Sequence, residues 1–266
     1  AASLLTACGG GDDGMEPTPR LASVDNFRDL AGADDAGVYR NAQGRGLRRG
    51  AFYRSNAVTP SDADWARLNT LDIKTVHDLR TPAESRAKPD RLPQGATLLS
   101  VDVSGDTYVM PTFHTAAEGV RVMEDAERVL VTNAGVRERL GGLLTTMAGR
   151  QGVQVFHCTA GKDRTGWVAA LLHTIAGVDE QVIVHDYVLT NSYTQERIQA
   201  TYQQMVASNG KEFADAYLPL LGVQESFLRA GMSQAVTSYG SMAGYISQGL
   251  KVSEATQQQL RNKLLA

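Results

Sequence analysis

The sequence predicts an α/β fold with a central, mostly parallel sheet flanked by helices. Four short β-rich runs occur, at 51–54, 73–78, 98–103 and 152–157. Helix-cap signals or apolar side chains with helical period separate each run from the next. Strands that alternate with helices form largely parallel sheets. Ligands bind such sheets at the carboxyl ends of the strands, so we expect the functional residues at that edge.

Each helix is expected from a local signal. The expected helices span 60–68, a segment that begins at Pro82, 136–147 and 168–175. Two of them open with Thr followed by Pro, at Thr59 and Thr81, and Glu84 forms a capping box with Thr81. Gly177 is placed where a glycine commonly ends a helix.

Composition excludes several classes of protein. The chain has 266 residues, of which 42% are hydrophobic and 21% charged, and this excludes disordered, collagenous and polytopic membrane chains. The net charge of −3 offers no basic field for nucleic acid. Two cysteines are too few for a disulfide framework or a Cys-rich zinc site. From the net charge we expect no nucleic-acid partner.

The N-terminal residues 1–20 differ in character from the rest. A short apolar stretch looks like the last part of a secretory signal. It ends in Leu5-Thr6-Ala7-Cys8, which resembles a bacterial lipobox, and a Gly/Asp-rich tether follows. The alternative is an ordinary tail with a chance cysteine. We expect lipidation at Cys8 and an exported, periplasmic or membrane-anchored lipoprotein that touches the membrane by its lipid anchor only. Residues 21–266 are expected to form one domain.

The segment from His157 to Gly166 lies between a predicted strand and a predicted helix. A tight turn that leads into a helix aims backbone N–H groups inward and adds the positive end of the helix dipole, which makes a phosphate-sized anion site. Gly161 permits a backbone conformation that a side chain would hinder. Arg164 supplies a planar fork for two phosphate oxygens. Cys158, at the base, lies in a field that favours the thiolate.

Ordinary explanations exist for each part of this segment. A cysteine at a strand end is usually a small hydrophobe, a Gly-rich loop often binds an anion without catalysis, and His157 is as readily structural as functional. Cys158 and Arg164 in a Cys-x5-Arg spacing, followed by Thr-Gly, are explained together by nucleophilic attack on a bound phosphorus atom. We therefore interpret the loop as catalytic.

This loop resembles the signature of the protein tyrosine phosphatases, in a version typical of a bacterial family. His157, Cys158 and the run Gly161–Gly166 stand at the matching positions. Further blocks that resemble the family lie at 26–30, 53–55, 78–84 and 239–246, so the resemblance runs roughly from Val24 to Leu265. It implies a strand–P-loop–helix arrangement and hydrolysis of phosphotyrosine. Some family members also accept phosphoserine, phosphothreonine and phosphoinositides.

The resemblance also implies roles for single residues. Cys158 is the nucleophile that forms a phosphocysteine intermediate, and Arg164 binds the phosphate and stabilises its developing charge. Thr165 assists departure of the thiolate. Lys162 adds a positive group at the rim, where it meets an additional phosphate or remains a solvated lysine. The phosphate-binding positions implied are Thr159, Ala160, Gly161, Lys162 and Thr165.

The general acid has two candidates, because the sequence lacks the Trp-Pro-Asp loop of the classical tyrosine phosphatases. Asp163 lies in the loop beside Arg164, and we prefer it. Asp78 ends a strand expected to neighbour the Cys158 strand, but it is equally suited to pair with Arg80 or Arg54. Asp78 and Arg54 are assigned to the substrate-binding wall.

Two other classes of function remain open. A rhodanese-like sulfur transferase also places a cysteine in an anion-cradling loop, and an inactive phospho-binding module would keep the loop without turnover. No metal or cofactor is expected, since the mechanism needs none and no His-Glu-x-x-His spacing occurs. The expected partner is a phosphorylated protein or phosphoinositide. The region 191–232 forms either a lid over the site or a surface helical hairpin, and the sequence leaves the oligomeric state open.

Overall fold

The computed structural model describes residue 18 and residues 20–32, 37–105 and 110–266. The expected export signal and the lipidation position Cys8 lie outside the described residues. Within the part that is described, no helix is both long and apolar enough to cross a membrane.

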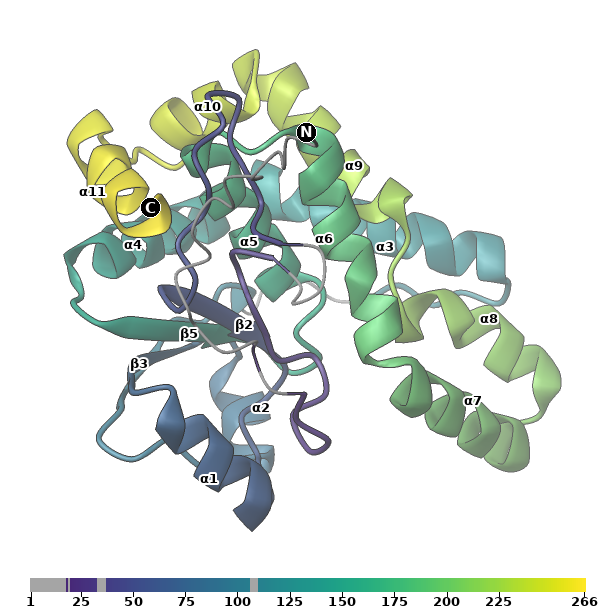
Figure 1. Cartoon of the computed structure of the whole chain (residues 1–266). Helices are drawn as coiled ribbons and strands as arrows, with labels where there is room; N and C mark the ends of the chain where they lie inside the picture. Colours follow the sequence, from purple (N-terminus) through teal and green to yellow (C-terminus); the bar gives the residue numbers. More distant parts are fainter. Residues whose placement is uncertain (1–17, 19, 33–36, 106–109) are drawn as a thin grey trace, which may run out of the picture.

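The predicted α/β fold is confirmed, with a sheet at the centre and helices packed around it (Figure 1). The sheet has the strand order β1-β2-β5-β3-β4. Its strands are β1 Arg28–Asp29, β2 Phe52–Ser55, β3 Ile73–Asp78, β4 Thr97–Ser100 and β5 Val153–His157. Only β1 runs antiparallel to its neighbour; β2, β5, β3 and β4 pair in parallel. The short β1 is the strand that the β-rich runs did not predict.

The pairing of the three central strands positions the site. Asp78 at the end of β3 and Ser55 at the end of β2 both lie in register with His157, the last residue of β5. The three strands therefore end at the same edge, and Cys158 begins the loop that leaves it. The expected proximity of the Asp78 and Cys158 strands is confirmed.

Helices make up most of the remaining chain. They are α1 Asp62–Thr70, α2 Pro82–Ala87, α3 Ala116–Thr132, α4 Ala134–Gly149, α5 Arg164–Ala176, α6 Glu180–Tyr193, α7 Gln195–Asn209, α8 Lys211–Leu221, α9 Glu225–Tyr239, α10 Met242–Gly244, the π-helical turn Tyr245–Gly249 and α11 Glu254–Leu264. Helix α5 is buried along nearly its whole length, with Trp167 and Leu171 at its centre. It forms the middle of the main hydrophobic core.

Two of the three predicted helix-end signals are confirmed. The capping box of Thr81 and Glu84 is present, and Gly177 ends α5 in the left-handed conformation with φ 80°. The predicted cap Thr59 is wrong: Ser61 caps α1, and its side chain accepts a hydrogen bond from the N–H of Asp64. The helix begins at Asp62, so Ser61 and not Thr59 is the residue directly before it, and a serine is a favoured cap.

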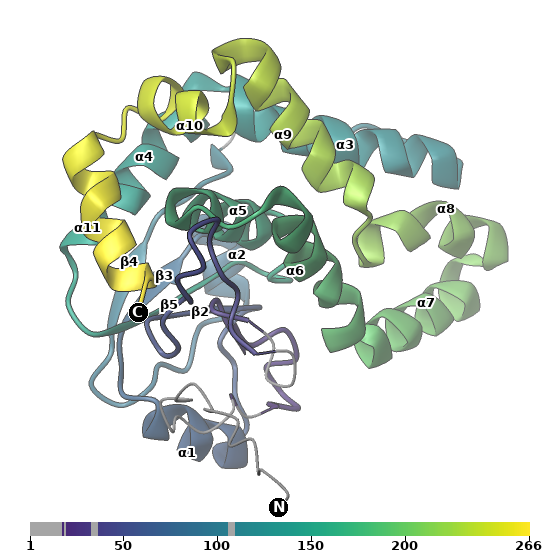
Figure 2. The same cartoon turned by 45° about the horizontal axis from the view of Figure 1, so that its top comes forward.

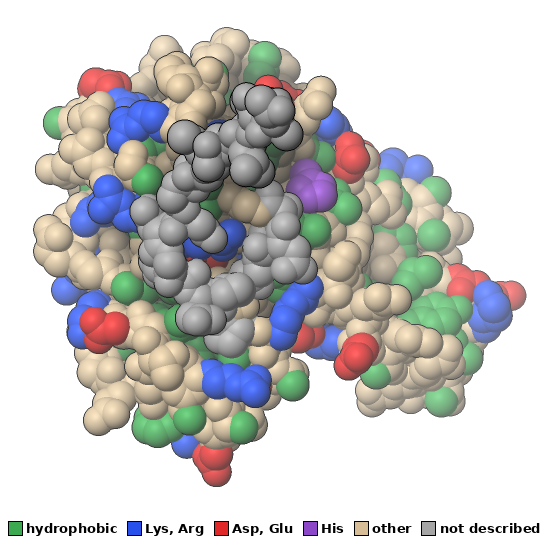
Figure 3. All heavy atoms as spheres, in the orientation of Figure 1, with side chains coloured by type: hydrophobic (Ala, Val, Ile, Leu, Met, Phe, Trp, Pro, Cys, Tyr) green, Lys and Arg blue, Asp and Glu red, His purple; other side chains and the backbone are tan. Residues whose placement is uncertain are grey.

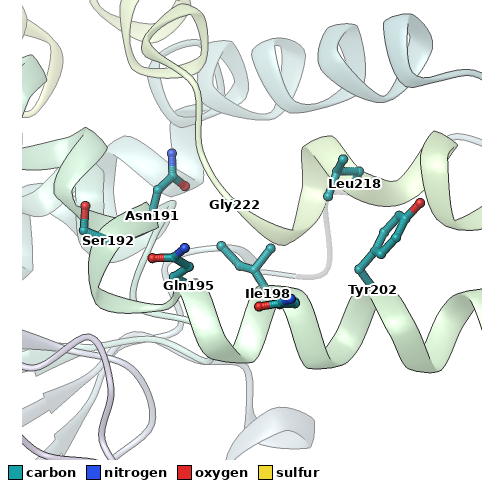
Figure 4. A pocket seen from close by; sticks show the side chains of 8 residues that line it. Asn191, Ser192, Gln195, Ile198, Tyr202, Leu218 and Gly222 are labelled. Carbon is teal, nitrogen blue, oxygen red and sulfur yellow. The ribbon is translucent and has the colours of Figure 1, made fainter.

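Helices α7 and α8 form a hairpin that projects from the body of the protein (Figure 2). No residue of α7 is buried. A cavity of about 640 Å³ lies at the base of this hairpin, beside the end of α6; Ile198 and Tyr202 of α7 face Leu218 of α8 across it (Figure 4). The alternatives of a lid and a surface hairpin both fit this arrangement, so the lid stays a prediction.

Candidate active site

The loop from Cys158 to Asp163 connects the end of β5 to the first turn of α5. Its carbonyl groups are held from behind. The carbonyl of Thr159 accepts a hydrogen bond from the N–H of Ala57 at 3.2 Å. The carbonyls of Ala160 and Gly161 accept from the Nδ2 of Asn26 at 3.3 and 2.8 Å. Since these carbonyls turn outward, the opposing N–H groups of the peptides turn into the cradle, as anion binding requires.

Gly161 is required at its position for two reasons. Its φ of +70° lies in the left-handed region that side chains disfavour. A Cβ atom there would also stand 2.4 Å from the carbonyl oxygen of Ser55. The loop can therefore lie this close to the end of β2 only with glycine, as we expected from the sequence.

Arg164 opens α5 and forms a two-pronged ion pair with Glu84 of α2. Its Nη1 and Nη2 atoms lie 2.8 and 2.7 Å from the two oxygens of that carboxylate. The hydroxyl of Thr159 donates a hydrogen bond to the same carboxylate. Burial opposes the charged form of Glu84, but the bonds from Arg164 and Thr159 outweigh it and hold the pKa of Glu84 well below its ordinary value. Arg164 therefore has a fixed orientation at the mouth of the loop.

Cys158 lies at the base of the loop and is 2% exposed. It is a free cysteine. The ring of the preceding His157 is fully buried, with Nδ1 3.2 Å from the carbonyl oxygen of Cys158 and Nε2 3.0 Å from Asp90. These contacts suit a structural His157 that fixes the end of β5.

Asp78 is not placed where we expected it to act on substrate. It is fully buried, and Arg80 donates to it through Nε at 2.8 Å, while Ser85 donates at 2.7 Å. Burial raises the pKa of Asp78, but the bonds from Arg80 outweigh burial and lower the pKa overall, so the group stays a carboxylate. Both oxygens of this buried carboxylate are occupied by donors from Arg80 and Ser85, which favours a role in fixing the wall of the site. The pairing with Arg80 is the alternative that the geometry favours.

Asp78, Asp90 and His157 bring three possible ligand atoms within 4.8 Å of one another. The guanidinium of Arg80 already bonds Asp78 and lies 2.9 Å from Asp90. A cation would have to displace this guanidinium, so the cluster is better described as a buried ion-pair network that fixes the wall beside the loop.

Arg54 is likewise a correction to its assignment as a substrate-binding residue. It is fully buried beneath the loop, and its Nη1 pairs with Asp186 of α6 at 2.6 Å. Its Nη2 donates to the carbonyl of Gly161 at 3.1 Å. Asp186 also pairs with Arg28 at 3.4 Å. Arg54 therefore positions the loop from behind rather than touching substrate.

Substitution of Asp186 by Asn is expected to destabilise the protein by about 3 kcal/mol or more near neutral pH, because it leaves Arg28 and Arg54 buried without a counter-charge. Burial raises the pKa of Asp186, but the two guanidiniums outweigh it and hold the pKa far below its ordinary value. A depressed pKa stabilises the fold above the unfolded-state pKa of about 4 and loses this effect as pH falls. Urea unfolding from pH 7 to pH 3 should show the difference in stability between the two proteins constant down to about pH 4 and narrowing below it. A difference that stayed constant over the whole range would contradict the ion-pair explanation.

A cavity of about 440 Å³ adjoins the loop. Lys162, Asp163 and Arg164 line one wall of it, and Met123, Leu130 and other apolar side chains of α3 line another. Lys162 is buried, with Nζ 3.0 Å from the carboxylate of Asp163, so the alternative of a solvated lysine is wrong. Of the two candidate acids, Asp163 is the one on this cavity. Thr165 lies behind the loop, fully buried.

Sequence reasoning missed two acidic residues at this site. Glu84 was recognised only as part of a capping box, and Glu127 of α3 was not singled out. A signal for Glu127 existed: it shares the spacing of Met123 and Leu130, so a carboxylic acid interrupts the apolar face of an amphipathic helix.

The fold and this loop define a class of protein. A cysteine lies at the base of an anion cradle and an arginine is held at its mouth, at the carboxyl edge of a parallel sheet. These are the parts of a cysteine-dependent phosphatase. Residues 19–266 match the profile of the tyrosine phosphatase family. The chain belongs to this family and is a phosphoric monoester hydrolase.

Three relatives agree with this placement. A protein of Cupriavidus necator, provisionally named a tyrosine-protein phosphatase, is 34% identical over 93% of this chain and 92% of its own length. The triple specificity protein phosphatase PtpB of Mycobacterium tuberculosis is 30% identical over 90% of this chain and 96% of its own length. A tyrosine-protein phosphatase of Nostoc commune is 31% identical, over 77% of this chain and 70% of that protein.

Proposed function

We propose that this phosphatase hydrolyses phosphotyrosine in proteins, with Cys158 as the nucleophile. The observation that carries the proposal is the fixed geometry of the loop: Cys158 at its base and Arg164 held by both oxygens of Glu84 at its mouth. The thiolate attacks phosphorus, the S–P bond forms as the bond to the leaving oxygen breaks, and water then releases phosphate from the cysteine. Arg164 and the loop amides balance the negative charge in both steps.

The shape of the adjoining cavity supports an aryl leaving group. Met110, Met123, Leu130 and Leu220 give it apolar walls next to Arg164. The ring of a phosphotyrosine buries apolar surface against such walls, whereas the short chain of a phosphoserine buries little. We expect phosphotyrosine to be the better substrate. Lys162 on the same cavity is available to an additional phosphate, and activity on phosphoinositides is part of the proposal, as the name of the mycobacterial relative suggests a broad specificity.

The test is phosphate release by the purified protein from a panel of substrates in excess EDTA. The panel contains a phosphotyrosine peptide, a phosphoserine peptide, phosphoinositides and a soluble inositol phosphate. We expect hydrolysis that EDTA leaves unchanged and vanadate blocks, with the phosphotyrosine peptide fastest. Loss of activity in EDTA, or equal rates on both peptides, would contradict the proposal.

The panel also separates the competing classes of function. Transfer of sulfur from thiosulfate to cyanide would support a rhodanese-like reaction. No hydrolysis of any phosphate ester, combined with binding of vanadate, would support a phospho-binding module without turnover.

We also propose that the protein is exported and anchored by lipid at Cys8. The support is the order of an apolar stretch, a lipobox-like Leu5–Cys8 and a Gly/Asp-rich tether in the sequence. Among the described residues on the face shown in Figure 3, Lys and Arg side chains are interspersed with Asp and Glu. Incorporation of labelled palmitate that a Cys8→Ser variant loses is the expected result; equal label in both would contradict the anchor.

A further inference from the structure

Glu127 is a buried acid with no partner. It lies in the second half of α3, is 1% exposed, and neither of its carboxyl oxygens has a hydrogen-bond partner among the described residues. A carboxylate in such a place would lose its hydration without compensation, so the group takes up a proton instead. Glu127 is thus a neutral carboxylic acid inside the protein.

This acid faces the catalytic loop. Glu127 lines the same cavity of about 440 Å³ as Lys162 and Asp163. Lys162 pairs with Asp163 at 3.0 Å, while Arg164 pairs with Glu84. One ammonium therefore faces two carboxyl groups, and it balances the charge of one of them. The other carboxyl group has no counter-charge, so it stays neutral by keeping a proton.

The surrounding charges act in the same direction. Burial is the largest cause that raises the pKa of Glu127, the charge of Asp163 adds to it, Lys162 opposes it, and Cys158 raises it slightly further. Tyr187 of α6 is the nearby titratable group behind the loop, and burial raises its pKa, so it stays neutral.

Three further helices pack on α3. On α4, Arg137 donates to the backbone carbonyls of Val131 and Thr132. The Arg139 guanidinium of the same helix lies beside Gly105, which lines the same cavity. On α9, Arg229 pairs with Glu225, and on α8, Lys211 pairs with Asp215, both on exposed surfaces. The pairs on α8 and α9 compensate themselves, and the charged groups that act on Glu127 are Asp163, Lys162 and Cys158 of the loop.

We propose that Glu127 and Asp163 share one proton, which resides on Glu127 in the free protein and reaches the leaving-group oxygen through Asp163. When the S–P bond forms and the bond to the leaving oxygen breaks, this proton goes to that oxygen. When water attacks the phosphocysteine and the S–P bond breaks, the proton of the water returns to the pair. Both residues line the same cavity of about 440 Å³, which is large enough to hold water. Glu127 is then a positioning residue that holds the proton.

This inference rests on the proposed phosphatase activity, and its test uses leaving groups of different basicity. The measurement is kcat/KM of wild type and Glu127→Gln on a series from 2,4-dinitrophenyl phosphate to phenyl phosphate. A weakly basic leaving group departs without a proton, whereas phenolate needs one. We expect Glu127→Gln to lower kcat/KM for phenyl phosphate by about 10- to 100-fold. Its kcat/KM for 2,4-dinitrophenyl phosphate should stay close to that of the wild type.

The matched control is Glu124→Gln, the same change one turn earlier on α3, where Glu124 lies near Arg128 rather than the loop. It should behave as wild type throughout the series. The double variant Glu127→Gln with Asp163→Asn should be no slower than Asp163→Asn alone, because the two residues act on one proton.

An equal loss on all leaving groups, or no loss on any, would overturn the shared proton. If a thermal melt shows that Glu127→Gln is unfolded, Glu127→Asp is measured instead. It should lose more activity on phenyl phosphate than on 2,4-dinitrophenyl phosphate, by a smaller factor than that expected for Glu127→Gln. Failure of the wild type to hydrolyse any aryl phosphate would instead overturn the proposed function.

Discussion

Replacement of Cys158 by Ser is expected to lower phosphate release from a phosphotyrosine peptide by roughly 10⁴-fold or more, the scale on which removal of a nucleophile acts. A serine hydroxyl is far less acidic than a thiol, so the loop can no longer present an anionic nucleophile to phosphorus. The side chain is buried and similar in size, so the cradle should persist and the variant should still bind the peptide.

The measurement combines steady-state rates with mass spectrometry after an acid quench. Wild type should carry one phosphoryl group on the peptide that contains Cys158, and the variant none. Cys8→Ser is the matched control, since the chain has just these two cysteines and Cys8 precedes the described residues. Turnover by Cys158→Ser close to the wild-type rate would remove Cys158 from the mechanism.

The parts of this site that the sequence predicted are those with a local pattern. Gly161, the capping box of Thr81 and Glu84 and the end of α5 at Gly177 each depend on neighbours a few residues away, so their signals are visible in a short window. The parallel sheet could be predicted for the same reason, because β-rich runs alternate with helix signals along the chain.

The contacts that orient the loop are different in kind. Asp186 meets Arg54 across 132 positions, and Glu84 meets Arg164 across 80. No periodicity in the sequence reports such pairs; they exist because β2, β3 and β5 end at one edge. Polar residues at strand ends were therefore correctly placed near the site, but their side chains could not be assigned to substrate or to each other. Arg54 and Asp78 were misassigned on this account.

Replacement of Arg164 by Lys is expected to reduce kcat/KM by about 10³-fold, or about 4 kcal/mol of transition-state stabilisation. Lysine keeps the positive charge but lacks the planar fork, so it loses the two-pronged bond to Glu84 at 2.7 and 2.8 Å and with it the fixed direction toward the phosphate. Because the pKa of Glu84 is held well below its ordinary value, this orientation persists in wild type at mildly acidic pH.

Two comparisons isolate the fork from the charge. Arg91→Lys makes the same change at an exposed arginine that pairs with Asp62 at 2.7 Å, and it should leave kcat/KM as in wild type. Glu84→Gln keeps Arg164 but loosens it, so its loss should fall between wild type and Arg164→Lys. If Arg164→Lys retained more than a tenth of wild-type kcat/KM, charge alone would suffice at this position. The ion pair with Glu84 would then serve α2 and the fold rather than the reaction.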